Sequence, residues 1–120
     1  ESDSPLEPLR GFSRAVVFGD TIYISGTSAL SAGGAVTGKD AYQQTKTIIE
    51  FIKTILGKSG FSLNDVVRTR LYVTDISQWT EFARAHNEAF DKIRPASLIV
   101  EVAKLTDPRL LIEMEVEAVR

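Results

Sequence analysis

The chain has 120 residues, of which 43% are hydrophobic and 25% charged, and its formal net charge at pH 7 is −2. This length and balance fit one globular domain. A slight excess of acidic residues argues against a surface that follows nucleic-acid phosphates, because such a surface needs excess Lys and Arg. No apolar run approaches the roughly 18 residues that a bilayer requires. We therefore expect neither a nucleic acid nor a membrane as a partner.

Cysteine is absent, which excludes disulfides, thiol nucleophiles and cysteine-based metal sites. The single histidine would leave a metal site almost wholly to carboxylates, and no acidic loop has the spacing of a calcium site. We expect no metal and no cofactor. We expect a flexible N-terminal segment over residues 1–10, one domain over residues 11–120, and a cytoplasmic location.

A β-hairpin is predicted near the N-terminus. A mostly apolar stretch from about Ser13 to Phe18 meets Gly19-Asp20, a pair that favours tight turns, and residues 21–25 are rich in β-branched and aromatic side chains. The small residues at positions 31–34 then predict a loop tip, since no strand-to-helix phosphate motif surrounds them.

The first predicted helix begins at Asp40. Its carboxylate can accept from free backbone N–H groups, and Gln43 stands three residues later, as in a capping box. Gly57 and Gly60 mark the expected end. The apolar residues lie on one helical stripe: Ala41, Ile48, Ile49, Ile52, Ile55 and Leu56.

A long strand is predicted over residues 66–74, after the turn-favouring Asn64-Asp65. Alternation places two sets of side chains on opposite faces: Thr69, Leu71 and Val73 on one, and Arg68, Arg70 and Tyr72 on the other.

The second predicted helix starts near Asp75 or Ser77 and must end before Pro95, because the residue before proline disfavours helical backbone. We expect its buried stripe to consist of Trp79, Phe82, Ala83, His86 and Phe90. His86 lies on this apolar stripe, and we expect it to be a packed, hydrogen-bonded residue.

The last quarter of the chain is predicted to form two strands, within residues 94–105 and 111–118, joined by a short turn. In the second, Ile112, Met114 and Val116 point one way and three glutamates the other. One amphipathic face on each helix indicates a two-layer α+β domain with both helices on one side of a mixed sheet. The opposite sheet face carries residues such as Phe12 and Tyr72, so it is half apolar and indicates a subunit interface.

Several motifs occur together in an informative order. They are Gly11-Phe12-Ser13-Arg14-Ala15, Gly19-Asp20, Ser25-Gly26, Val66-Val67-Arg68-Thr69, Val73-Thr74-Asp75, Arg94-Pro95-Ala96, Val100-Glu101-Val102-Ala103 and Glu113-Met114-Glu115. With these motifs the chain resembles the RidA/YjgF family of reactive-intermediate deaminases, from about Gly11 to Val119. The resemblance implies a chorismate-mutase-like fold and a homotrimer that forms a central barrel, with ligand clefts between neighbouring subunits.

The resemblance also implies a chemistry. Deaminating members hydrolyse an enamine or imine of a short 2-keto acid to a carbonyl compound and ammonia. Glu113 matches a glutamate that helps to position water, Ser25 matches a serine that precedes a glycine, and Phe12 stands at the place of a tyrosine. An arginine that grips the substrate carboxylate follows Pro-Ala in those members, and here that position is Ser97.

Ser97 has neither the charge nor the planar fork of an arginine, and Phe12 lacks the tyrosine hydroxyl. The chain therefore resembles a divergent branch of the family. Arg14 and Arg70 are the candidates to bind an anion in the cleft instead. The alternative for each is a structural ion pair with a glutamate at position 113, 115 or 117. Likewise, Glu113 could belong to a solvated strand face, and the Ser25 hydroxyl could bond to backbone.

Three functions remain open at this level. The first is binding of a small carbonyl or imine metabolite between subunits, with hydrolysis of an enamine or imine. The second is binding or sensing of a small carbonyl or carboxylate ligand without turnover. The third is the endoribonuclease or translation-inhibitor activity associated with some members of the family, which the acidic balance and the lack of a basic, aromatic stripe disfavour most.

Overall fold

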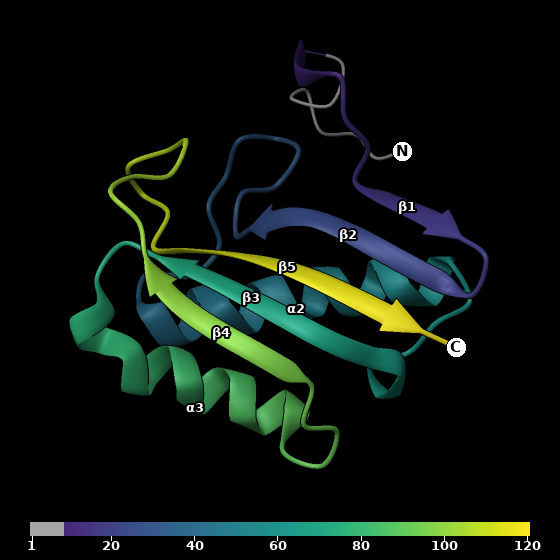
Figure 1. Cartoon of the computed structure of the whole chain (residues 1–120). Coiled ribbons are helices and arrows are strands. Elements are labelled where there is room, and N and C mark those ends of the chain that lie inside the picture. Colours follow the sequence, from purple (N-terminus) through teal and green to yellow (C-terminus); the bar gives the residue numbers. More distant parts are fainter. Residues whose placement is uncertain (1–8) are drawn as a thin grey trace.

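The computed structural model describes residues 9–120. In this part of the chain the elements are β1 (Ala15–Phe18), β2 (Thr21–Ser28), α2 (Ala41–Lys58), β3 (Val66–Val73), α3 (Trp79–Phe90), β4 (Ala96–Glu101) and β5 (Ile112–Val119). The strands form one sheet in the order β1-β2-β5-β3-β4. β3 and β4 run parallel, and the other neighbours are antiparallel. Both helices lie on the same side of the sheet (Figure 1). The predicted two-layer α+β fold with a mixed sheet is confirmed; of the predicted N-terminal segment, residues 1–8 lie outside the described residues.

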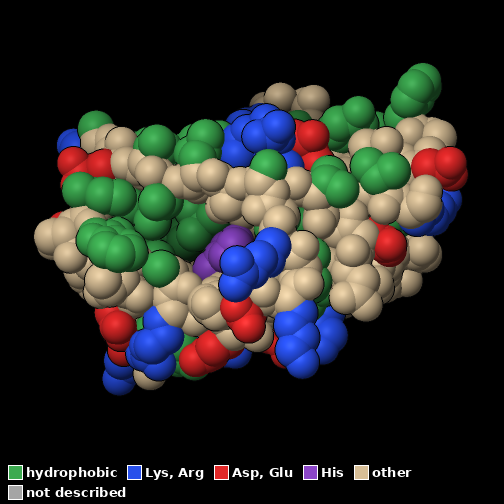
Figure 2. All heavy atoms as spheres, turned by 60° about the horizontal axis from the view of Figure 1, so that its bottom comes forward, with side chains coloured by type: hydrophobic (Ala, Val, Ile, Leu, Met, Phe, Trp, Pro, Cys, Tyr) green, Lys and Arg blue, Asp and Glu red, His purple; other side chains and the backbone are tan. Residues whose placement is uncertain are grey.

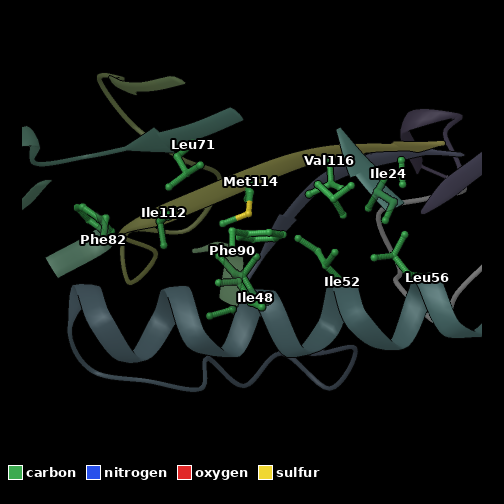
Figure 3. Close-up of a cluster of buried hydrophobic side chains, with 14 of the residues drawn as sticks. Ile24, Ile48, Ile52, Leu56, Leu71, Phe82, Phe90, Ile112, Met114 and Val116 are labelled. Carbon is green, nitrogen blue, oxygen red and sulfur yellow. The ribbon is translucent and has the colours of Figure 1, made fainter. Parts of the chain in front are cut away.

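The core lies between this sheet and α2 and α3. Alternate residues of β2, β3 and β5 point toward the helices, as their period of two requires. Figure 3 shows how side chains of α2 meet those of the sheet, with Phe82 and Phe90 entering from α3. Each such fully buried aliphatic or aromatic side chain contributes about 1.5–3 kcal/mol to folding. The largest fully buried apolar side chains are Phe82, Ile22, Ile48, Ile52, Leu56, Ile112, Met114, Val73 and Val116.

Helix α2 follows its sequence signals closely but not in every detail. The Asp40 carboxylate accepts from the backbone N–H of Gln43, so the predicted N-cap is present. The side chain of Gln43, however, accepts from the backbone N–H of Lys39, so the capping box is not closed on Asp40 itself. Gly57 lies inside the helix, and the chain leaves it at Gly60, whose φ of +81° is the left-handed conformation that glycine adopts without strain.

The start of the second helix differs from the prediction. A short 3-10 helix, η2 (Ile76–Gln78), takes the first positions, and α3 begins at Trp79. The Trp79 side chain is 54% exposed, so its predicted place in the core is wrong. Trp79 is the first residue of α3. The buried positions of the helix begin one turn later, at Phe82, and include Ala85.

The two C-terminal strands are not joined by a short turn. β3 lies between β4 and β5, and a connection over residues 102–111 carries the chain from the sheet edge back to its centre. Gln44, a buried residue of α2, fixes this connection. Its amide oxygen accepts from the N–H of Leu111 at 2.8 Å, and its amide nitrogen donates to the carbonyl of Arg109 at 3.0 Å. A polar residue on the apolar stripe thus holds the end of a loop.

The sheet face opposite the helices has no covering layer among residues 9–120. Several apolar side chains on it are 41–78% exposed: Val16, Phe18, Tyr23, Leu98, Val100 and Val119. Their strand partners place them on the same face as the three glutamates of β5. No helix in the described part of the chain is long and apolar enough to cross a membrane. An apolar sheet face of this kind is typical of a protein–protein contact.

Candidate functional site

A cleft of about 470 Å³ opens on the uncovered sheet face, where β2 and β5 lie side by side. We call it the glutamate cleft. It brings together three of the residues singled out in the sequence, Phe12, Ser25 and Glu113. The cleft is lined by Arg10, Phe12, Ser25, Gly26, Tyr72, Val102, Lys104, Leu105, Glu113 and Glu115.

Two of the three glutamates on β5 have a partner on the neighbouring strand β3. The Arg70 guanidinium binds Glu117, with 2.7 Å between Nη1 and Oε1. The Tyr72 hydroxyl donates to Glu115 Oε1 at 2.5 Å. Both contacts are diagonal. The direct strand partners are Arg70 with Glu115 and Tyr72 with Glu113, and each side chain instead reaches the glutamate two residues further along β5. Glu113 makes no such contact with any residue that the structure describes, and its carboxylate lines the cleft.

The surroundings of Glu113 favour its protonated form. Burial, the largest influence, raises the pKa of its carboxyl, and the charge of Glu115 raises it further. The positive charges of Arg10 and Arg14 act in the opposite direction without cancelling the effect of burial. Removing a carboxylate from water disfavours its charge, and the group then exchanges protons closer to neutral pH.

The position of the Glu113 carboxyl depends on Gly26. The register of β2 with β5 shifts between Ile24 and Thr27, and we call this irregular part, which contains Gly26, the bulge of β2. A β-carbon on Gly26 would come within 2.9 Å of the Glu113 carboxyl carbon and would overlap one carboxyl oxygen. The glycine therefore allows the carboxyl to lie directly on the backbone of the neighbouring strand.

Two side chains that donate to backbone carbonyls hold the N-terminal part of the cleft. The Ser25 hydroxyl donates to the carbonyl of Ser13 at 2.6 Å, and the Arg14 guanidinium donates to the carbonyl of Gly26 at 3.1 Å. Phe12 is partly buried, and the Arg10 guanidinium lies 4.6 Å from the centre of its ring. Ser25 and Arg14 thus tie the segment before β1 to the bulge of β2.

Sequence reasoning did not single out two cations of the cleft, Arg10 and Lys104. Arg10 was assigned to the flexible segment, although it lies only two residues before Phe12. Lys104 follows directly after a quoted motif, at the start of the connection from β4 to β5. Lys104 is outside the regular elements, and Arg10 ends a helical segment just before Gly11, so periodicity carries no signal for where their side chains lie.

Ser97 lies elsewhere. It pairs with Thr69 in the sheet register, and the hydroxyls of the two residues are hydrogen-bonded at 2.6 Å, on the face that carries α3. Nearby is a hollow of about 330 Å³ lined by His86, Asn87, Phe90, Asp91, Arg94 and Pro95. The histidine side chain is visible at the surface in Figure 2, beside hydrophobic side chains.

Ser97 and Glu113 therefore do not meet within one protomer. They lie on opposite faces of the sheet, with β3 between their strands. Their partners on β3, Thr69 and Tyr72, are three residues apart, which is about 10 Å along a strand. Among residues 9–120, no cluster of three or more His, Asp or Glu side chains could hold a metal ion.

Comparisons with known proteins agree with this geometry. The family described as Endoribonuclease L-PSP matches residues 2–120. A RutC family protein of Pyrococcus abyssi is 36% identical over 110 residues, which cover 91% of this chain and 86% of that protein. The 3-aminoacrylate deaminase RutC of Acinetobacter baylyi is 32% identical over 108 residues, with 89% and 85% of the two chains covered.

The crystal structure of Rv2704 from Mycobacterium tuberculosis, a member of the YjgF/YER057c/UK114 family, superposes with a TM-score of 0.90 at 43% identity. The match covers 98% of this chain and 93% of that one. The order of the motifs, the fold and these matches agree, and the chain belongs to the Endoribonuclease L-PSP family, the group that contains the RidA, YjgF and RutC proteins.

Proposed function

We propose that the protein binds a small carbonyl or imine metabolite in clefts between subunits and hydrolyses an enamine or imine to a carbonyl compound and ammonia. The observation that carries this proposal is the state of Glu113. Of the three glutamates on β5, it alone lines a cleft without a tyrosine or arginine partner among the described residues, and burial raises its pKa. A carboxyl in this state suits proton transfer near neutral pH.

The proposed reaction is balanced with water alone. Water attacks the carbon of the protonated imine, and the Glu113 carboxylate accepts one of its protons as the carbon–oxygen bond forms. The protonated carboxyl then returns this proton to the nitrogen of the tetrahedral intermediate. As the carbon–nitrogen bond breaks, the remaining hydroxyl proton passes to the Glu113 carboxylate and the carbonyl forms. Ammonia takes up this proton and leaves as ammonium. Gly26 supports this role by letting the Glu113 carboxyl lie at the floor of the cleft.

We further propose that three copies of the chain associate through the uncovered sheet faces. The exposed apolar side chains on that face support association, since burying them would remove them from water. The positions of Ser97 and Glu113 on opposite faces support a shared cleft, because a ligand that contacts both needs one residue from each of two protomers. The family resemblance implies the same arrangement.

The cations near the cleft take three different roles in this proposal. Arg70 already binds Glu117, so we assign it to the sheet contact between β3 and β5. Arg10 and Lys104 line the glutamate cleft, and we propose that they attract the anionic end of a ligand. Arg14 contributes positive charge near Glu113 while its guanidinium holds the Gly26 carbonyl.

The test is an assay in which 2-iminobutanoate is generated in situ and its loss is followed with and without the protein. We expect acceleration by the wild type, none by Glu113→Gln, and wild-type rates from the matched control Glu50→Gln on the exposed side of α2. If 2-iminobutanoate disappears at the same rate with and without the wild-type protein, and a keto acid raises the melting temperature, the protein binds the ligand without turnover. A rate increase in Ser97→Arg would show that a carboxylate clamp suits the remaining site.

A further inference from the structure

A chain of three polar side chains links α3 to the exposed edge of the sheet. His86 Nε2 lies 2.9 Å from Thr69 Oγ1, and Thr69 Oγ1 lies 2.6 Å from Ser97 Oγ. The three residues come from α3, β3 and β4. Thr69 at the centre is fully buried, His86 is partly buried, and Ser97 is exposed. This row of hydrogen-bonded side chains thus runs from a helix, through the core, to a hydroxyl at the surface.

The tautomer of the imidazole decides the direction of these hydrogen bonds. The Thr69 hydroxyl carries one hydrogen, so it donates in one of its two contacts and accepts in the other. With the proton of His86 at Nε2, the imidazole donates to Thr69 and Thr69 donates to Ser97. The hydrogen of Ser97 is then available for an acceptor outside the protein.

Two further observations describe the state of the imidazole. Burial lowers the pKa of His86, which keeps the imidazole neutral with a single N–H at pH 7. The ring of Phe90 lies 4.6 Å from the imidazole, centre to centre, and limits its rotation. The charged residues that line the same hollow, Asp91 and Arg94, form an ion pair with each other at 3.4 Å.

We propose that His86 carries its proton at Nε2 and acts as a positioning residue that orients Ser97 through Thr69, and that Ser97 contacts the ligand as a hydrogen-bond donor. The proposal rests on the cleft between subunits proposed above. The ligand would present an acceptor oxygen to Ser97. Because a hydroxyl is a neutral donor, this end of the site suits an uncharged carbonyl or carboxamide, whereas the arginine of deaminating members suits a carboxylate.

The experiment compares the binding of 2-oxobutanamide and 2-oxobutanoate by calorimetry. We expect Ser97→Ala, Thr69→Val and His86→Asn each to weaken 2-oxobutanamide binding about 3- to 10-fold, the loss of one hydrogen bond. His86→Gln should restore it, because a glutamine amide can donate from the place of Nε2, whereas the shorter asparagine cannot. Ser97→Arg should shift the preference toward 2-oxobutanoate.

A spectroscopic readout separates positioning from mere stability. The chain has one histidine, so its long-range 1H–15N spectrum contains one imidazole. We expect the Nε2–H tautomer in the wild type and a changed Nε2 shift in Thr69→Val. Wild-type binding by Thr69→Val and His86→Asn, or an Nδ1–H tautomer, overturns the inference.

The outcome is distinguishable from that of the proposed hydrolysis. If the wild type fails to turn over 2-iminobutanoate but the variants weaken 2-oxobutanamide binding as described, the hydrolysis falls and the positioning role stands. If turnover is present but unaffected by Thr69→Val and His86→Asn, and their binding is that of the wild type, the positioning role falls alone. If the wild type binds neither ligand and shows no turnover, both fall.

Discussion

The carboxyl group of Glu113 occupies the space that a β-carbon on Gly26 would need. One residue is on β5 and the other on the bulge of β2, so the contact joins two neighbouring strands at the floor of the glutamate cleft. The carboxyl is the movable partner, because a glutamate side chain rotates more readily than a sheet backbone.

Gly26→Ala should therefore move the Glu113 carboxyl rather than unfold the protein. We expect imine hydrolysis to fall at least 10-fold while the melting temperature changes by a few degrees at most, since the added methyl meets the end of a flexible side chain. Gly33→Ala is the matched control, because a β-carbon on Gly33 meets nothing within 4 Å. Retained activity in Gly26→Ala would show that the close approach is not needed.

Glu113→Gln should stabilise the fold at neutral pH. The folded-state pKa of Glu113 is raised above its ordinary value near 4.5. The favourable contribution of this group is thus present below about pH 4.5 and is lost as the pH rises through the folded pKa. We expect the variant to melt above the wild type at pH 7 and the difference to shrink toward pH 4. Glu50→Gln serves as the control. An equal difference in melting temperature at pH 7 and pH 4 would show that the pKa of Glu113 is not raised by folding.

Charges placed on the uncovered sheet face should dissociate the assembly. Val16 and Tyr23 are direct strand partners on that face and are 54% and 48% exposed. A double change to aspartate should convert a trimer to monomers in light scattering after gel filtration, because burying two carboxylates without partners is costly. Lys53→Asp, on the exposed side of α2, should leave the mass unchanged. A wild type that is already monomeric would remove the premise.

Gln44→Ala should destabilise the fold by about 1–3 kcal/mol. The change removes the acceptor of the Leu111 N–H and the donor to the Arg109 carbonyl, so a partly buried backbone group loses its partner. Urea unfolding at pH 7 measures the effect. Gln43→Ala, one residue earlier and exposed, should cost less. Equal midpoints for the two variants would show that the loop is held by other contacts.

The fold was predictable from the sequence where burial imposes a period. The stripes on α2 and the alternation of Ile112, Met114 and Val116 place these side chains in the core, and the structure confirms it. Trp79 was misplaced because helical spacing says nothing about where a helix begins relative to the edge of its sheet. The neighbours of β4 were not predictable either, since strand order depends on contacts between distant segments.

The candidate site was predictable only in part. Phe12, Ser25 and Glu113 share a cleft because strands and turns with clear signals carry them. Arg10 and Lys104 were missed because no helical or strand pattern in the sequence places their side chains. The contacts of Thr69 with His86 and Ser97 join residues 17 and 28 positions apart, and no local pattern encodes them.

The sheet order has a consequence for how the site can change. Glu113 lies on β5, the middle strand of the five, where its backbone is paired on both sides. Ser97 lies on β4, an edge strand, with an exposed side chain. A substitution at such an edge position disturbs less core packing than one on the central strand. The range of ligands can thus diverge at the rim of the sheet while Glu113, the residue proposed to act in hydrolysis, stays fixed at its centre.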